Sequence, residues 1–337
     1  MVILNIVKIL FTLGFLVLIH EGGHFLVAKA FHVKVNEFSI GFGKKILSKK
    51  KGETEYNLRI VPLGGFVSML GEDERSDDER SFSKQSIPKR LAIVVAGATV
   101  NIVFGLIVYF LLLAISGNYA TKTIESVAED MPAALAGIEA NDEIVEVNGE
   151  KVKLYSDIAN KLAQAGTNDI EITVNRNGEF KKFNLAPKKV EQDGQEKILI
   201  GVYFKPSGNS FKERIYYSFF ETTRFIKFLG GSVISIFTKG INVQDMTGPI
   251  GISKTVAKTS SVYEFIYLLA IISLSLGITN LLPIPALDGG KILILIIEAI
   301  RRKPMKEKTE IAIQLVGFSF LILLSLYISY IDILRFF

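Results

Sequence analysis

Two histidines and a glutamate stand within five residues near the start of the chain, in the order His20-Glu21-Gly22-Gly23-His24. Side chains four residues apart on a helix point to the same side, so two imidazoles in this spacing can bind one Zn²⁺. A glutamate between them can act as the general base that takes a proton from water. The motif therefore predicts a hydrolytic centre in which His20 and His24 bind the metal and Glu21 is catalytic.

The competing interpretation is a chance match, or buried histidines whose hydrogen bonds are satisfied within the protein. However, two of the three histidines of the chain fall in this motif, inside an apolar segment. A charged side chain at the centre of a membrane helix costs about 2.5–3.5 kcal/mol, and ionisable groups persist there mainly where they pair or bind something. These observations favour a metal site.

A catalytic zinc site usually has three protein ligands and a water molecule, so two histidines leave it incomplete. The chain has no cysteine, and the best candidate for the third ligand is Asp288, in the segment NLLPIPALDGG at residues 280–290. The prolines of this segment break a helix. Asp288 is equally suited to be the N-cap of a helix over residues 291–300. Its distance from the two histidines decides between these interpretations.

These residues lie in a chain with the composition of a membrane protein. Of 337 residues, 49% are hydrophobic and 22% are charged, and the net charge is +5, with a mean hydropathy of +0.36. Four apolar runs, residues 2–30, 91–116, 265–287 and 311–331, are each long enough to cross a bilayer as a helix. This pattern excludes an ordinary soluble globule and a disordered chain. A cleaved signal peptide is the alternative for the first run, but no small-residue cleavage site follows it.

Lysines and arginines near the ends of the spans predict the orientation in the membrane. Thirteen lie between Lys29 and Arg90, and five more lie in residues 301–308, between the third and fourth spans. Both loops are therefore expected in the cytoplasm, and the long segment 118–261 on the opposite side. The mild excess of basic residues is interpreted as loop charge that sets the topology, and not as a sign of nucleic acid binding. Membrane lipid is an expected partner.

The segment 118–206 has the pattern of a small α/β domain. Strands are predicted over residues 124–127, 142–147, 169–174 and 180–185, with hairpin turns at Asn148-Gly149 and Asn177-Gly178. Helices are predicted over 132–136 and 156–165, the second with Ser156 as its N-cap. The order Met131-Pro132-Ala133-Ala134, Gly137-Ile138 and 142–149 resembles a PDZ domain, a module that typically binds an extended peptide at a sheet edge. The alternative is a structural spacer with a closed groove.

Residues 211–239 mix basic side chains with many aromatic and aliphatic ones, and their uncharged core is too short to span a membrane. We interpret this part as one or two amphipathic helices on the membrane surface. A linker helix packed against the PDZ-like domain is the alternative.

The order of these features along the chain resembles the bacterial site-2 protease family, and most closely its RseP-type branch of intramembrane zinc metalloproteases. The resemblance covers nearly the whole chain. It implies a multi-pass α-helical membrane protein with four transmembrane helices, a membrane re-entrant β-loop and an extracytoplasmic α/β PDZ-like domain. One departure is that only one PDZ-like module fits here, where some relatives carry two.

The resemblance divides the chain into four parts. Residues 1–117 hold the first two transmembrane helices, the histidine motif and the cytoplasmic β-loop, and residues 118–206 are the PDZ-like domain. Residues 207–260 form the membrane-surface helices, and residues 261–337 hold the last two transmembrane helices with the NxxPxPxLDG motif.

The resemblance also implies roles for single residues. His20, His24 and Asp288 would bind Zn²⁺, and Glu21 would activate water. Asn101, in the pattern G-x-x-x-N at 97–101, and Asn280 would bind or position the substrate backbone. Gly64 and Gly65 belong to the segment 57–67, which looks like the family's re-entrant β-loop and would offer an edge strand from about residue 59 to 67 to the substrate. For Asn101, a hydrogen bond between helices is the alternative.

The function implied is hydrolysis of peptide bonds within the transmembrane segments of single-span proteins, in regulated intramembrane proteolysis. The expected substrates are anti-sigma factors already cut outside the membrane and remnant signal peptides. The expected location is the bacterial cytoplasmic membrane, with the active site toward the cytoplasmic side. Alternatives from other classes are a non-catalytic membrane adaptor that presents the PDZ-like module, and a transporter with a broken helix. The transporter lacks support because the two halves show no internal repeat.

Overall fold

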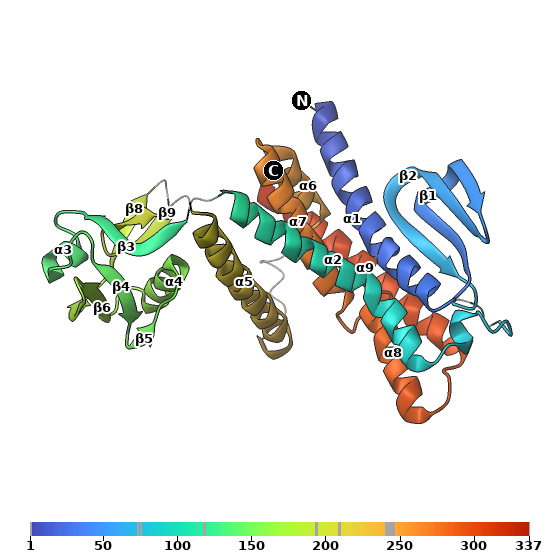
Figure 1. Cartoon of the computed structure of the whole chain (residues 1–337). Helices are drawn as coiled ribbons and strands as arrows, with labels where there is room; N and C mark the ends of the chain where they lie inside the picture. Colours follow the sequence, from blue (N-terminus) through green and yellow to red (C-terminus); the bar gives the residue numbers. More distant parts are fainter. Residues whose placement is uncertain are drawn as a thin grey trace. The chain divides into compact units, whose positions relative to one another are not determined.

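The computed structural model describes residues 2–72, 74, 76–116, 119–192, 195–207, 210–239 and 247–336 (Figure 1). The chain forms two compact units. The first consists of Met1–Tyr109 and Gly231–Phe337, and the second of Phe110–Gly230. The domain boundary predicted between residues 117 and 118 lies outside the described residues.

Four helices are long and apolar enough to cross a membrane, which confirms the four predicted spans. They are α1 (Val2–Ala30), α2 (Ile87–Ser116), α7 (Val262–Asn280) and α9 (Glu307–Phe336). The predicted end of the third span is wrong, because α7 stops at Asn280 rather than at residue 287. Pro283 and Pro285 follow in an irregular segment, where they cannot continue a helix, and the chain then enters α8 (Asp288–Arg301).

Glycines allow α1, α2 and α7 to approach one another closely, as is usual for helices packed in membranes. A Cβ atom on Gly23 of α1 would lie 2.7 Å from the Ala96 carbonyl oxygen of α2. On α7, a Cβ atom on Gly277 would lie 2.7 Å from the carbonyl oxygen of Ala98. The three helices that carry or flank the predicted site residues are thus held backbone to backbone.

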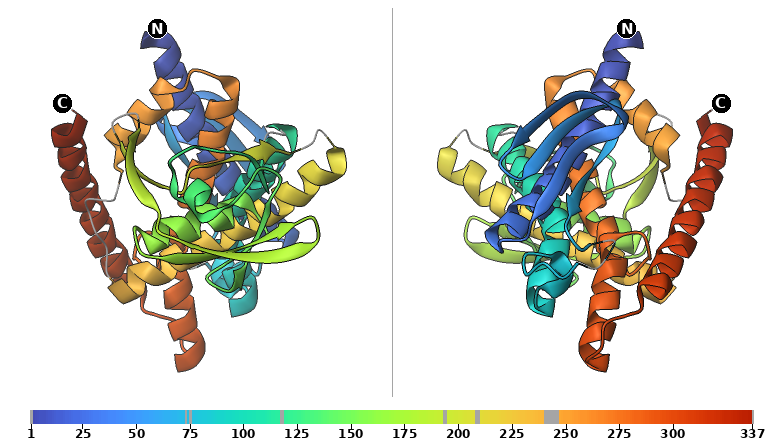
Figure 2. Two further views of the ribbon diagram at one scale, coloured as in Figure 1. Left: turned by 90° about the vertical axis from the view of Figure 1, so that its left-hand side faces the viewer. Right: turned by 90° about the vertical axis from the view of Figure 1, so that its right-hand side faces the viewer.

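A long antiparallel hairpin, β1 (Val35–Lys51) and β2 (Thr54–Met69), lies beside α1 (Figures 1 and 2). The hairpin folds back on itself, because residues 37–40 pair both with 65–68 and with 55–58. Residues 65–69 therefore form a free edge of this sheet within the described residues, and this edge is shorter than the predicted segment 59–67. A short helix, η1 (Phe82–Lys84), follows the hairpin. Its Phe82 is buried with Ala28, Val33 and Ile93 in an apolar cluster under the sheet.

Helix α6 (Pro249–Lys258) packs against α1 and α9. The buried carboxylate of Asp332 accepts a hydrogen bond of 2.8 Å from the Gly251 N–H in the first turn of α6. Lys8 of α1 donates to the Thr259 carbonyl oxygen, also at 2.8 Å, just beyond the end of this helix. These two contacts fix both ends of α6.

The second unit holds a β-sheet and two short helices that match the predicted α/β pattern. The sheet order is β10-β3-β4-β6-β7, and β5 pairs with β4. The strands are β3 (Ala120–Val127), β4 (Glu143–Val147), β5 (Glu150–Lys151), β6 (Ile170–Arg176), β7 (Glu179–Leu185) and β10 (Val202–Pro206), with a separate hairpin of β8 (Lys188–Gln192) and β9 (Gln195–Leu199). The core between the sheet and the helices is aliphatic, with Ile124, Ile144, Ile158 and Ile172 fully buried. We call residues 119–207 the PDZ-like domain.

Its helices are α3 (Pro132–Ala136), as predicted, and α4 (Tyr155–Ala165). The prediction that Ser156 is the N-cap of α4 is wrong, because the helix begins one residue earlier with Leu154 at the cap. The carboxylate of Asp157 accepts hydrogen bonds from the N–H groups of Lys153 and Leu154, which takes over the capping role. The Ser156 hydroxyl instead donates to Glu221.

Residues 211–239 form one continuous helix, α5 (Phe211–Lys239). Its first half contacts the PDZ-like domain through the bond between Ser156 and Glu221 and through Lys153, whose ammonium lies 5.6 Å from the ring centre of Phe220. These contacts match the alternative of a linker helix packed on the domain. Attachment of α5 to a membrane surface stays a prediction.

Candidate metal centre

Three side-chain atoms that can bind a metal ion lie close together in a triangle, two of them on α1 and one at the start of α8. The Nε2 atoms of His20 and His24 lie 3.3 Å apart, and the Asp288 Oδ2 atom lies 3.2 Å and 3.4 Å from them. These three residues are the only group of His, Asp or Glu within the described ranges that is arranged to hold a metal ion. The short distances from Asp288 to both histidines therefore make Asp288 a candidate ligand. Its interpretation as an N-cap is wrong, because Leu287 is the N-cap of α8 and Asp288 is the first helical residue.

The triangle fits zinc. Ligand atoms about 2.0–2.1 Å from a tetrahedral Zn²⁺ lie roughly 3.3–3.4 Å from one another, close to the three observed separations. With the proton of each imidazole on Nδ1, all three atoms would present lone pairs to the same point, an arrangement that a bound cation stabilises. The Asp288 Oδ2 atom is also buried and makes no hydrogen bond within the described residues. The donor set of two imidazoles and one carboxylate is common in zinc hydrolases and leaves a fourth position for water.

Helix α2 fixes the orientation of the His24 ring. The Nδ1 atom of His24 lies 2.9 Å from the Ile93 carbonyl oxygen. This contact requires the proton on Nδ1 and leaves the Nε2 lone pair for a metal ion. Gly97 lies one turn further along α2, directly against the same ring. Sequence reasoning did not find the Ile93 contact, since a backbone carbonyl carries no sequence signal.

The segment before α8 places the Asp288 carboxylate. Ala286 has a left-handed backbone with φ +72°, and its N–H donates to the side-chain oxygen of Gln314 on α9 at 2.7 Å. A Cβ atom on Gly290 would lie 2.5 Å from the Ile284 carbonyl oxygen, so only glycine allows α8 to start this close to the segment. Gln314 is a further residue that the sequence did not reveal, because its partner is a backbone N–H in a distant segment.

Glu21 lines the same cavity as the three ligand candidates, a space of about 270 Å³. The free edge of β2 borders this cavity through Phe66, Val67 and Met69. A Cβ atom on Gly65 would lie 2.7 Å from the Ser39 carbonyl oxygen and 3.5 Å from Glu21 Cγ. Glycine at this position therefore lets the strand approach α1 beside the glutamate.

Gly64 also requires glycine, because its φ is +113° and a Cβ atom would overlap the Phe42 ring. Both predicted glycines thus have a structural reason beside any contact with substrate. The two predicted asparagines lie near His20: Asn280 Nδ2 is 3.5 Å from His20 Nε2, and Asn101 Nδ2 is 3.4 Å from His20 Nδ1.

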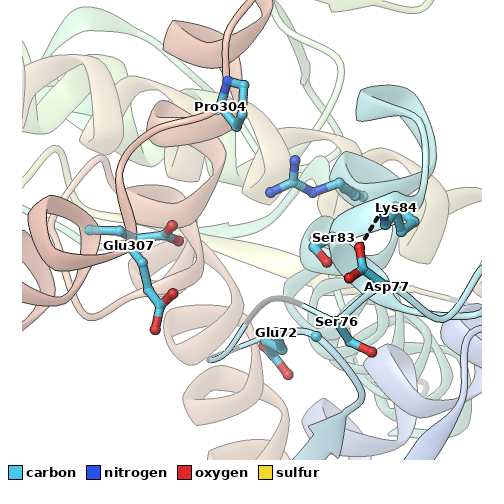
Figure 3. A pocket seen from close by; sticks show the side chains of 10 residues that line it. Glu72, Ser76, Asp77, Ser83, Lys84, Pro304 and Glu307 are labelled. Atoms are coloured by element: carbon cyan, nitrogen blue, oxygen red, sulfur yellow. Dashed lines mark ion pairs between the residues drawn. The ribbon is translucent and has the colours of Figure 1, made fainter.

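An ion pair that the sequence did not predict closes one side of the cavity. Lys291, one turn after Asp288, donates to Glu72 at 2.7 Å. Glu72 also borders a neighbouring polar cavity of about 380 Å³, which Asp77, Lys84 and Glu307 line as well (Figure 3). Asp77 and Lys84, which both line this second cavity, form an ion pair of 3.0 Å (Figure 3).

The PDZ-like domain has a groove of its own, with a volume of about 710 Å³. Tyr155, Ala159 and Leu162 of α4 form one wall, and Val202 and Phe204 of β10 form the other. Since β10 is an edge strand of the sheet, an extended peptide could pair with it there.

Comparison with known proteins shows the family of the chain. The model of peptidase family M50 matches residues 8–324. A relative in Clostridium perfringens, provisionally named a zinc metalloprotease, is 36% identical over 98% of both chains. A relative of the same provisional name in Clostridium acetobutylicum is 34% identical over 98% of this chain and 97% of its own. The zinc metalloprotease RasP of Geobacillus kaustophilus is 28% identical over 99% of this chain and 98% of its own.

Among solved structures, the PDZ domain of an SdrC-like protein from Listeria monocytogenes is similar to part of the chain. It is 20% identical, covers 26% of this chain and 88% of its own length, and superposes with a TM-score of 0.23.

The names of the three sequence relatives, all zinc metalloproteases, agree with the zinc cofactor that the sequence predicts. Because the family model matches almost the entire length and two relatives exceed 30% identity over nearly full chains, this protein belongs to peptidase family M50.

Proposed function

We propose that this protein is an integral-membrane zinc peptidase that hydrolyses peptide bonds within the transmembrane segments of single-span proteins. One observation carries the proposal: His20, His24 and Asp288 form a triangle that lines the same cavity as Glu21. Glu21 and both histidines lie on α1, a helix long and apolar enough to span a bilayer. Family membership supports the peptidase activity. A non-catalytic adaptor has no use for a complete ligand set with a carboxylate beside it.

His20, His24 and Asp288 would hold the zinc ion, which supplies Lewis-acid activation of water and of the scissile carbonyl when it is bound. The Glu21 carboxylate takes the proton of the attacking water and later delivers it to the leaving amine. The peptide C–N bond breaks, and a new carboxylate and a new amine form. The hydrogen bond from His24 to Ile93 keeps the ring in the tautomer that this chemistry needs.

A substrate helix shields its peptide bonds with its own hydrogen bonds, so it must unwind before it is cut. The free edge at residues 65–69 borders the cavity, and an unwound segment can pair with it by strand addition. Gly65 allows this strand to lie close to Glu21, and Gly64 leaves room for the Phe42 ring. Asn280, which lines the cavity, is the side chain we assign to the freed backbone groups of the substrate.

We further propose that the protein lies in a bacterial cytoplasmic membrane, with the metal centre toward the cytoplasm and the PDZ-like domain outside. The lysines and arginines of residues 29–90 and of the loop between α8 and α9 support this orientation. The substrates proposed are anti-sigma factors already cut outside the membrane and remnant signal peptides. The PDZ-like domain would act as a filter against untrimmed substrates, so deletion of residues 118–206 should permit cleavage of full-length substrate. Unchanged selectivity after this deletion would contradict the filter.

The decisive test of the proposal combines zinc content with cleavage of a single-span reporter. Glu21→Gln should keep stoichiometric zinc and lose cleavage, whereas His24→Ala and Asp288→Asn should lose zinc. His32→Ala, at the only histidine outside the motif, is the matched control and should change neither property. Cleavage by Glu21→Gln would remove this residue from the mechanism, and full zinc occupancy in Asp288→Asn would require another third ligand.

A further inference from the structure

The Asn101 side chain of α2 is completely buried next to the Nδ1 atom of His20. Its Nδ2 atom lies 3.4 Å from His20 Nδ1, and its Oδ1 atom has no hydrogen-bond partner in the described part of the chain. A buried amide oxygen without a partner is costly, at about 1–3 kcal/mol. The amide orientation therefore needs to be derived from what His20 requires.

The position of the His20 ring determines which nitrogen carries the proton. Its Nε2 atom faces His24 and Asp288 and needs a free lone pair there, so a neutral ring must carry its proton on Nδ1. An N–H on Nδ1 that faces the Asn101 NH₂ group would bring two donors together. The oxygen and nitrogen of an amide have nearly the same shape, so a half-turn of the side chain puts Oδ1 opposite His20 Nδ1. This orientation replaces two facing donors by a hydrogen bond in which Asn101 Oδ1 is the acceptor.

The two histidines are then held in the same way by one helix. His24 Nδ1 contacts the Ile93 carbonyl oxygen, and His20 Nδ1 contacts Asn101, two turns further along α2. Gly97 lies midway between them and lets the helix pack directly on the His24 ring. The spacing G-x-x-x-N thus places a glycine against one imidazole and an acceptor against the other, because the two helices run past each other with matching one-turn steps.

Helix α7 holds the backbone of Asn101 in place. The Ser273 hydroxyl donates to the Asn101 carbonyl oxygen at 2.8 Å, and both residues are fully buried. This bond joins α2 to α7 without involving the Asn101 amide. Helix packing and histidine orientation are therefore carried by different atoms and can be tested separately.

We propose that Asn101 is a positioning residue that accepts a hydrogen bond from His20 Nδ1–H and so controls zinc affinity, rather than a residue that binds substrate. The inference rests on the proposed function only in taking His20 as a zinc ligand. Partners of this kind on metal-bound histidines typically contribute 10–100-fold to metal affinity.

The test uses the full chain in detergent and measures the zinc dissociation constant by competition with a chromophoric chelator. Asn101→Leu has a similar volume and no acceptor, and it should weaken zinc binding 10–100-fold and perturb the visible spectrum of the cobalt-loaded protein. Asn101→Asp keeps an acceptor and should restore the affinity to within a few fold of the natural protein. Ser273→Ala removes only the bond between helices and should leave the zinc affinity unchanged.

The KM of a reporter substrate at saturating zinc completes the test. The proposal expects the same KM for Asn101→Leu and for the natural protein. Unchanged zinc affinity with a raised KM would overturn it in favour of substrate binding. Equal losses of zinc affinity in Asn101→Leu, Asn101→Asp and Ser273→Ala would overturn it in favour of simple helix packing. If the natural protein bound zinc and His24→Ala did not, the proposed function would stand whatever the Asn101 variants did. If the natural protein bound no zinc, both proposals would fail.

Discussion

Gly97→Ala is the smallest change that should disable the metal centre without unfolding the protein. A Cβ atom at this position would lie 2.7 Å from Cε1 and 2.8 Å from Cδ2 of His24, and closer still to Nε2. Carbon atoms in contact are normally at least about 3.5 Å apart, so the ring or the helix must move by roughly 1 Å. A zinc site tolerates errors of only about 0.2 Å in its ligand distances.

The expected effect on zinc is large, and the expected effect on stability is small. A displacement of about 1 Å at a catalytic group can cost roughly 100-fold, or about 2.7 kcal/mol. An added methyl group in a packed core costs about 1–3 kcal/mol. Replacing glycine by alanine within a helix returns about 1 kcal/mol, so Gly97→Ala should remain folded. We expect zinc affinity and reporter cleavage to fall together, each by about 100-fold.

Gly22→Ala is the matched control, since it makes the same change within the histidine motif. No heavy atom lies within 4 Å of the Cβ position of Gly22. This variant should bind zinc and cleave the reporter like the natural protein. Zinc titration, reporter cleavage and the elution profile in detergent should be measured on both variants. If Gly97→Ala bound zinc and cleaved the reporter as well as the natural protein does, α2 would not be packed tightly enough against the His24 ring for this reasoning to hold.

Two further predictions follow from contacts away from the ligands. Gln314→Leu removes the acceptor for the Ala286 N–H and should weaken zinc binding about tenfold, whereas Gln314→Glu keeps the acceptor and should restore it, as zinc competition will show. In the PDZ-like domain, burial raises the pKa of the Asp142 carboxyl, but hydrogen bonds from Arg176 and the backbone of Glu139 outweigh it and hold the pKa below its ordinary value of 3.8. Asp142 therefore stabilises the domain above that pH and loses this contribution as the pH falls through its lowered pKa. Hydrogen exchange of β4 and β6 between pH 5 and pH 3 should show this loss, and Asp142→Asn should be less stable by about 2 kcal/mol and lack the pH dependence.

Much of the local structure is encoded in short stretches of sequence. The lengths of the apolar runs predicted the four helices that could cross a membrane, because a span of about 20 apolar residues is recognisable without knowledge of its neighbours. The turn pair Asn177-Gly178 marks the hairpin of β6 and β7, and the left-handed φ of +54° at Asn177 is typical of such a turn. The prediction of the cap at Ser156 was wrong, because the helix begins at Tyr155 and the Asp157 carboxylate accepts hydrogen bonds from the N–H groups of Lys153 and Leu154.

The sequence by itself predicted the chemistry of the site: the pair His20 and His24 with Glu21 between them, Asp288 as the best candidate for a third ligand, and the apolar surroundings. These depend on residue type and on spacing within one helix. Only the tertiary structure decided that Asp288 meets both histidines, that residues 65–69 are the strand edge at the cavity, and that Asn101 lies behind His20, 81 residues away in the chain. Such contacts depend on how closely the backbones of separate helices can approach, which the glycines between them set and which no local pattern specifies.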